Sequence, residues 1–264
     1  MSLTETLSNR ELLWNLTLRE LRTRYRRSVL GWAWSMINPL ATMVIFTIVF
    51  SQVFRAPEPI GEPSGLEAFP LYLLCGLLPW NFFSVSVGAS MGAMAANAGL
   101  VKKVWFPREV LVVSTTLSLV VSLGIELGVL SVALIIAGNM VIPWLLPLAA
   151  VVALLVVFTI GMALIFSALN VFYRDVGYLW TVLAQAWFYL TPIVYPIEIV
   201  PEWLRRIVSA QPMGGFVVAF HNILYDLRWP SAGRWVHLVV CAGVALALGQ
   251  WVFARMSPRF AEEL

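Results

Sequence analysis

The sequence predicts an all-α integral membrane protein, a single domain over residues 1–264 with six transmembrane helices. Of the 264 residues, 60% are hydrophobic and 12% are charged, whereas soluble domains carry about 25% charged residues. A soluble core of this size cannot bury so much apolar surface. Six apolar stretches each reach the roughly 20 residues with which a helix crosses a bilayer core, and this length favours helices as the fold class.

The N-terminal segment is predicted to be an amphipathic helix over residues 8–28 that lies in the membrane interface. Ser8 and Glu11 match a capping box. A stripe of apolar side chains recurs at helical spacing beside several arginines: Trp14, Leu18, Leu21 and Tyr25. Three more leucines widen this stripe: Leu12, Leu13 and Leu16. We therefore expect the helix to pack on protein as well as on lipid, with a simple basic anchor as the alternative.

The six predicted spans are residues 31–54, 69–96, 108–137, 143–172, 176–195 and 235–254. An even number of spans places both termini on one side of the membrane. If that side also holds the loops at 97–108 and 173–175, it carries twelve of the 17 Lys and Arg residues. Positive charge marks the cytoplasmic side, so both termini are expected in the cytoplasm.

The loop at 97–107 combines charge with aromatic side chains. It holds Lys102 and Lys103, followed by three apolar residues, Val104, Trp105 and Phe106, and Arg108 comes just after it. Apolar anchors inside a charged rim are typical of docking interfaces. A plain positively charged connector is the alternative, but it explains only the charge. In the other cytoplasmic turn, Arg174 and Asp175 form either a secondary contact or a local ion pair.

The segment at 198–226 lies between spans five and six, on the outer side. Its apolar pieces are too short to cross a bilayer, and such pieces are more often re-entrant or interfacial. Pro212, Gly214 and Gly215 interrupt the segment. We therefore expect two short helices, at about 201–210 and 215–226, that dip back into the outer leaflet.

Signals of catalysis are nearly absent. The two histidines, His221 and His237, lack metal-ligand spacing. No phosphate-binding loop of the form G-x-x-x-x-G-K-[ST] is present. We therefore expect a chain that is not an enzyme and binds no cofactor, so that any ATP is hydrolysed by another polypeptide. Glu126 is the one acid deep inside a span, where it is either a functional group or a hydrogen-bonded residue that holds helices together.

Aromatic side chains fall into two groups. Trp80, Trp144 and Trp235 are interpreted as members of the belts that mark span ends. The others lie deeper in spans one and five: Phe46, Phe50, Trp180, Trp187, Phe188 and Tyr189. Aromatic faces suit sugar C–H surfaces and lipid chains, although ordinary helix packing explains any single one of them.

Four stretches in chain order resemble a known family. They are YRRSVLGWAWSMINPLATMVIFTIVFSQVF (25–54), NAGLVKKVWFPREVL (97–111), NVFYRDVGYLW (170–180) and FYLTPIVYPIEIVPEWLRRIVSAQPM (188–213). The chain resembles the permease subunit of bacterial ABC exporters that move lipid-linked O-antigen, capsule, galactan or wall teichoic acid across the plasma membrane. One departure is QPM at 211–213, where the family usually has Asn before Pro-Met.

The resemblance implies a homodimer in the bacterial plasma membrane above two copies of an ABC ATPase subunit, which bind ATP and Mg. The substrate would be an undecaprenyl- or other lipid-linked glycan, surrounded by membrane lipids, with no nucleic acid involved. Residues 97–107 would form a coupling helix, and the deeper aromatics of spans one and five would line the conduit. Two short helices would gate its outer end, with four residues at the gate: Pro201, Trp203, Pro212 and Met213.

Two other classes of function stay open. An ion-coupled secondary transporter of a lipid or glycolipid predicts several membrane-embedded coupling groups and an internal repeat, whereas Glu126 is a single acid and no repeat is evident. A membrane enzyme acting on lipid-linked sugars predicts clustered acids or histidines. His221 and Asp226 are the only such neighbours.

Overall fold

A computed structural model describes residues 10–24, 33–53, 59–103 and 106–263. The described part is helical, with an isolated bridge between Ile60 and Glu67 and no strand, which confirms the all-α class. The α-helices are α2 (Arg10–Arg24), α3 (Ala33–Thr47), α4 (Phe69–Ala96), α5 (Ala98–Lys103), α6 (Glu109–Ile136), α7 (Leu145–Phe172), α8 (Val176–Leu190), α9 (Glu202–Ala210), α10 (Pro212–Phe220), α11 (Ala232–Met256) and α12 (Phe260–Glu263). Short 3-10 or π segments are η1 (Ile48–Val53), η2 (Ile142–Trp144), η3 (Ile197–Ile199), η4 (His221–Tyr225) and η5 (Ser257–Arg259).

Four helices are long and apolar enough to cross a membrane: Phe69–Ala96, Glu109–Ile136, Ile142–Phe172 and Ala232–Arg259. Their bounds lie within a few residues of the predicted spans. The pair formed by α9 and Pro212–Tyr225 is bent by 91°, as in a broken span or a re-entrant loop, and it brings the count to at most five. By contrast, α8 has 15 residues and so measures only about 22 Å. The six-span count therefore stays a prediction.

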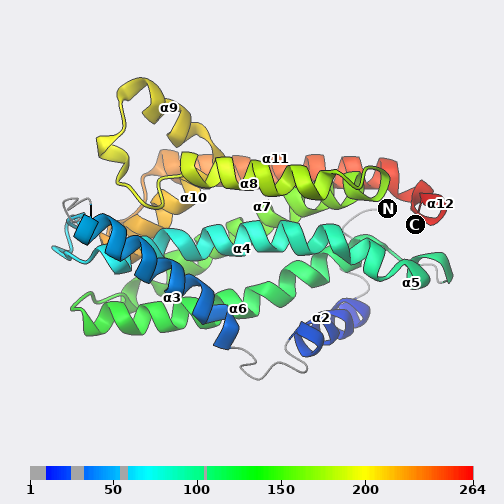
Figure 1. The fold of residues 1–264 in the computed structure, drawn as a ribbon, viewed down its shortest axis with the longest axis horizontal. Helices are drawn as coiled ribbons and strands as arrows, with labels where there is room; N and C mark the ends of the chain where they lie inside the picture. The colour runs from blue at the N-terminus through cyan, green and yellow to red at the C-terminus, as the bar shows by residue number, and fades with distance from the viewer. Residues whose placement is uncertain (1–9, 25–32, 54–58, 104–105, 264) are drawn as a thin grey trace.

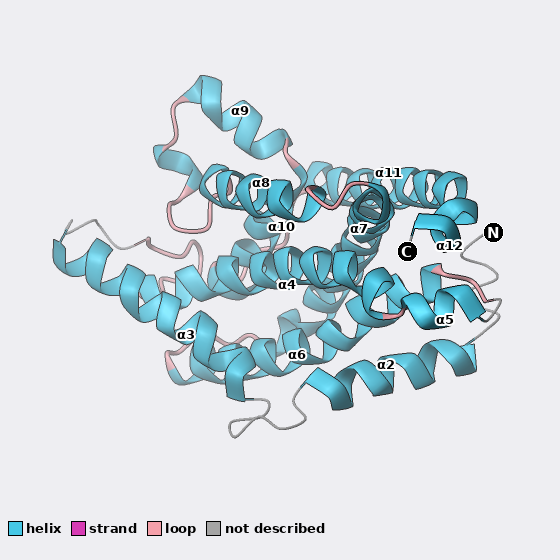
Figure 2. Cartoon of the chain, turned by 45° about the vertical axis from the view of Figure 1, so that its right-hand side comes forward, coloured by secondary structure: helices cyan, strands magenta, loops and turns pink. Residues whose placement is uncertain are grey.

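Helix α4 lies at the centre of the bundle, between α6 and α7, and α11 packs along the far side of α7 (Figures 1 and 2). Two glycines permit the close approach of α7 and α11. A Cβ on Gly161 would lie 2.4 Å from the carbonyl carbon of Ala245, and one on Gly249 would lie 2.3 Å from the carbonyl oxygen of Gly161. Small residues at such crossings let helix backbones approach closely.

The N-terminal helix α2 packs on protein, as expected. It lies along α6, with Leu16 and Thr17 buried and Trp14 exposed. The Arg19 guanidinium donates a hydrogen bond of 2.8 Å to Oδ1 of Asn97, which caps the C-terminal end of α4. The rest of the predicted 8–28 helix, including the capping box at Ser8, lies outside the described residues.

The outer segment forms two short helices, but the second begins earlier than predicted. Helix α10 starts at Pro212 because proline is favoured in the first turn of a helix, and Gly214 and Gly215 lie inside it. A Cβ on Gly214 would lie 2.2 Å from the Val208 carbonyl oxygen, and one on Gly215 would lie 2.8 Å from the His237 ring. These glycines therefore serve close packing inside α10, and the break that the sequence placed at Pro212, Gly214 and Gly215 lies at Gln211, directly before Pro212.

Candidate functional site

Aromatic side chains from α3 and α8 meet over α4. The ring of Phe46 stacks on that of Phe50 at 6.1 Å between centroids, and it lies 6.3 Å from the ring of Phe188. Phe188 in turn lies 5.8 Å from Trp80 of α4. The structure therefore brings together aromatics that the sequence placed on spans one and five, and Trp80 of α4 joins them through Phe188.

Trp80 and Phe83 are the centre of this aromatic cluster. Trp187 lies 6.3 Å from Trp80 and 5.3 Å from Phe83, and Trp180 lies 5.7 Å from Phe83. Trp80 is 4% exposed and lies well inside α4, so its interpretation as part of an interface belt was wrong. Residues three apart share a helix face, and the pair Trp80 and Phe83 in PWNFF is the signal that could have revealed it.

A groove of about 470 Å³ lies between α4 and α8. Its aromatic lining is Trp80, Trp180, Phe188 and Tyr189, and its polar lining is Ser84, Thr181 and Gln185. None of the residues that line it is charged. A pocket with apolar walls and a few neutral polar groups can hold an uncharged ligand in a fixed orientation, and aromatic faces with hydroxyl and amide groups suit sugar rings.

Trp187 faces a different, apolar pocket of about 370 Å³, between α7, α8 and α9. Its indole N–H donates a hydrogen bond to Oε1 of Gln211, and Gln211 Nε2 donates one of 3.2 Å to the Thr191 hydroxyl. Gln211 lies at the sharp bend between α9 and α10. One side chain therefore connects α8 to the bend, at the position where QPM departs from the family's usual Asn.

The predicted gate residues do not share one surface. Pro201 and Trp203 are exposed on and beside α9, with Trp203 at 68%, whereas Met213 is fully buried in α10. Pro212 is partly buried at the start of α10. Helix α9 therefore carries the exposed part of this region and α10 belongs to the core.

At the opposite end of the molecule from α9 lies α5 (Figure 1). Lys102 and Lys103 are exposed in its last turn, and Val101 is buried. Phe106 is 8% exposed and packs in the hydrophobic core. The expectation that Phe106 presses into a partner needs correction, because the side chain anchors the loop to its own chain. Val104 and Trp105 lie outside the described residues.

Arg108 faces the C-terminal segment instead of an exposed rim. It donates a hydrogen bond to the Ser257 carbonyl oxygen, and its guanidinium lies 5.9 Å from the ring centroid of Phe260. The Phe260 ring is buried against Phe172 and Phe253, at 5.9 and 5.2 Å. The packing of this segment beside α5 was not predicted from the sequence, because the pattern around Phe260 is short and polar.

Arg174 and Asp175 are both exposed in the turn between α7 and α8. Among the described residues the ion pair present is that of Arg19 with Glu20, at 3.1 Å. The two charges in this turn therefore form no local ion pair, and both side chains are exposed. The described structure is shown again, turned by 45°, in Figure 2.

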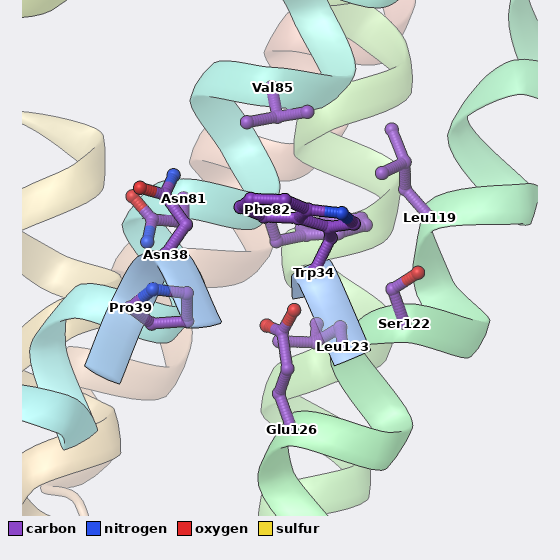
Figure 3. Close-up of a pocket in the computed structure, with 10 residues that line it drawn as sticks. All are labelled: Trp34, Asn38, Pro39, Asn81, Phe82, Val85, Leu119, Ser122, Leu123 and Glu126. Carbon is purple, nitrogen blue, oxygen red and sulfur yellow. The ribbon is translucent and has the colours of Figure 1, made fainter. Parts of the chain in front are cut away.

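Glu126 is 8% exposed on α6 and lines a cavity of about 290 Å³ between α3, α4 and α6 (Figure 3). His221, the histidine that the sequence paired with Asp226, takes part in packing: its ring stacks on that of Tyr72 at 4.0 Å between centroids, and its Nε2 lies 3.0 Å from the Tyr72 carbonyl oxygen. No group of three His, Cys, Asp or Glu residues in the described segments could hold a metal ion.

The chain is similar to named transport proteins along nearly all of its length. The model of the ABC-2 type transporter family matches residues 11–225. The O-antigen export system permease protein RfbA of Myxococcus xanthus is 30% identical over 98% of both chains. The polysialic acid transport protein KpsM of Escherichia coli is 24% identical over 71% of this chain and 70% of that one. The capsule polysaccharide export inner-membrane protein CtrC of Neisseria meningitidis is 23% identical over 95% of this chain and 93% of that one. Since the family model covers most of the sequence, this chain belongs to the ABC-2 type transporter family.

Proposed function

We propose that this chain is the permease subunit of an ATP-driven exporter of a lipid-linked polysaccharide, of the O-antigen, galactan, capsular or teichoic-acid type. It acts as a homodimer in the bacterial plasma membrane, with both termini in the cytoplasm. The names of its relatives support polysaccharide as the cargo. The observation that carries the proposal is the uncharged aromatic groove between α4 and α8.

The chemistry of the groove fits a chain of sugars that slides through. Its rings offer apolar faces, and the side chains of Ser84, Thr181 and Gln185 offer neutral hydrogen-bonding groups. Without a charge in the lining, no single contact is strong enough to hold a sugar for long, because hydrogen bonds to charged groups are about twice as strong as neutral ones. Tyr189, at 62% exposed, lies at the open side of the groove, where a second copy of the chain completes the conduit.

Energy comes from two ATPase subunits that bind ATP and Mg at the cytoplasmic end. Exposed charges at this end come from two elements: Lys102 and Lys103 of α5, and Arg174 with Asp175 before α8. Closure of the ATPases pushes on α5, whose Val101 and the following Phe106 are buried in the core. The push therefore reaches α4 and α6, which flank α5 along the chain.

A substitution that fills the groove tests whether polysaccharide passes through it. Ser84→Phe adds a ring inside the lining, and we expect surface polysaccharide to fall at least tenfold in cells that carry the chain, its ATPase and the glycan synthesis enzymes. Leu179→Phe is the matched control, because Leu179 is exposed on α8 and does not line the groove. Surface polymer is measured by antibody staining at equal membrane levels of each variant. Wild-type export by Ser84→Phe would contradict the proposal.

A further inference from the structure

A second space lies beside the groove, on a neighbouring face of α4. The cavity of about 290 Å³ lies between α3, α4 and α6, and Glu126 of α6 faces it. Val85 of α4 lines both this cavity and the groove, so the two spaces are neighbours. We call it the Glu126 cavity, after the acid that Figure 3 shows pointing toward the Trp34 and Phe82 rings.

Each of three apolar helices contributes an amide or a carboxyl group to this one space. Asn38 is the only Asn or Gln of α3, and Asn81 is the only one of α4. Glu126 is the only acid of α6 beyond its first turn, and Ser122 lies one turn before it. Polar side chains inside membrane helices are costly and mark functional positions unless they serve only as contacts between helices.

Hydrogen bonds between helices do not explain why Asn38 and Asn81 stand in these apolar helices. Asn38 is exposed and Asn81 is partly exposed, and within the described part of the chain neither side-chain amide makes a hydrogen bond to protein. Each amide therefore has a donor and an acceptor free for a bound molecule. Both line the cavity together with the Glu126 carboxyl group.

The size and the walls of the cavity decide which ligand fits. A volume of about 290 Å³ is far too large for a dehydrated cation and is enough for one pyranose ring. Trp34 and Phe82 form an aromatic wall beside the polar groups (Figure 3). Sugar hydroxyls both donate and accept hydrogen bonds, as amides do, and carboxylates accept them.

We propose that the Glu126 cavity is a sugar-binding subsite, which holds one ring of a lipid-attached saccharide beside the conduit. Asn38 and Asn81 both donate hydrogen bonds to sugar hydroxyl groups and accept hydrogen bonds from them, and the Glu126 carboxyl group accepts a hydrogen bond from a further hydroxyl. The Trp34 and Phe82 rings cover the C–H face of the sugar. The inference rests on the proposed function for the source of its ligand. The attached lipid leaves through the exposed side of α3, where Trp34 and Asn38 lie.

Photolabelling of the full chain tests this subsite. The chain, with any subunits that co-purify, is placed in nanodiscs of phosphatidylethanolamine and phosphatidylglycerol, and octyl β-glucoside with a diazirine on its ring is the probe. We expect labelled residues on α3 near Trp34 and on α6 near Glu126, identified by mass spectrometry. Unmodified octyl β-glucoside should remove this labelling and octanol should not. Equal competition by octanol would overturn the proposal, since the cavity would then bind the alkyl chain.

Variants separate the subsite from the groove. Asn38→Leu with Asn81→Leu should lower labelling of the cavity about tenfold, and the isosteric Glu126→Gln should lower it several-fold. Thr181→Val with Gln185→Leu changes only the groove and should leave cavity labelling within twofold. Undiminished labelling in both cavity variants would overturn the proposal, even if one of them folded poorly.

A further set of competitors in the same experiment identifies the source of the bound sugar. Competition by a polyprenyl-linked saccharide identifies the exported substrate as the occupant, and competition by a glucosyl diacylglycerol alone identifies a membrane glycolipid. Competition by neither would overturn the subsite. The readout needs no export, so a failure of the Ser84→Phe test would reject the proposed function while leaving the cavity result standing.

Discussion

Gln211 is the residue that ties the α9–α10 bend to α8. Its two amide atoms satisfy the Trp187 indole N–H and the Thr191 hydroxyl, and Trp187 contacts Trp80 and Phe83 behind the groove. A shift of the bend therefore acts on the rings that shape the groove. A shorter Asn at this position would not reach both partners from the same backbone.

The link through Gln211 is tested by Gln211→Leu, which keeps the bulk of the side chain and removes both hydrogen bonds. A partly buried indole N–H left without its acceptor costs about 1–3 kcal/mol. We expect a lower thermal unfolding midpoint, followed by tryptophan fluorescence in detergent, together with weaker export. Gln185→Leu is the control for the midpoint, because Gln185 is exposed; since Gln185 lines the groove, export is not compared with this variant. An unchanged midpoint in Gln211→Leu would show that the link carries no free energy.

Single residues also show what the sequence could and could not predict. The deeper aromatics of spans one and five were expected to line a conduit because of the family resemblance. Of the six, Trp180, Phe188 and Tyr189 line the groove, whereas Phe46, Phe50 and Trp187 do not. Trp80 was placed wrongly, because a helix that is apolar on every side has no periodicity that distinguishes a buried face from an exposed one. Phe106 was placed wrongly because it lies in the loop between α5 and α6, where a short sequence pattern does not show that the chain's own core buries it. Val104 and Trp105 remain predictions.

At the scale of helices, the contact between α7 and α11 depends on missing side chains. Gly249 of α11 meets the backbone of Gly161, while Gly243 of the same helix has nothing within 4 Å of an added Cβ. These two glycines are a matched pair on one element. Only the first is needed for packing.

Gly249→Ala should therefore destabilise the bundle, because its methyl group would lie 2.3 Å from a backbone oxygen. Gly243→Ala should be neutral or slightly stabilising, since Ala favours the helix by about 1 kcal/mol over Gly. The measurement is the midpoint of thermal unfolding, which should be lower in Gly249→Ala than in Gly243→Ala. Similar midpoints for the two would contradict the packing described for α7 and α11.

The exposed end of α5 makes a separate prediction about partners. Lys102→Glu with Lys103→Glu reverses two exposed charges without disturbing the buried Val101. We expect the ATPase subunit to be lost from pull-downs in mild detergent while membrane insertion and thermal stability stay unchanged. Arg10→Glu on α2, also exposed, is the control for charge alone. Equal ATPase recovery from the double variant and the wild type would remove α5 from the coupling surface.

For the whole molecule, hydropathy predicted the four long helices well, since length and apolar composition determine them. It did not predict the short α8, which ends at Leu190 because Pro192 biases Thr191 toward the extended conformation that it adopts. The two end regions, α9 on one side and α5 with α12 on the other (Figure 1), hold the segments for which gating and coupling stay predictions. The contacts within these end regions, such as the hydrogen bond of Arg108 with Ser257, join segments far apart in sequence. A local sequence pattern therefore cannot predict them.

The most direct measurement of the central claim is transport in sealed vesicles that contain the chain with its ATPase subunit and a labelled lipid-linked glycan. We expect translocation that requires ATP, persists when the proton and sodium gradients are dissipated, and is abolished by Ser84→Phe. Translocation driven by an ion gradient without ATP would contradict the exporter and support an ion-coupled transporter, with Glu126 as its candidate coupling group.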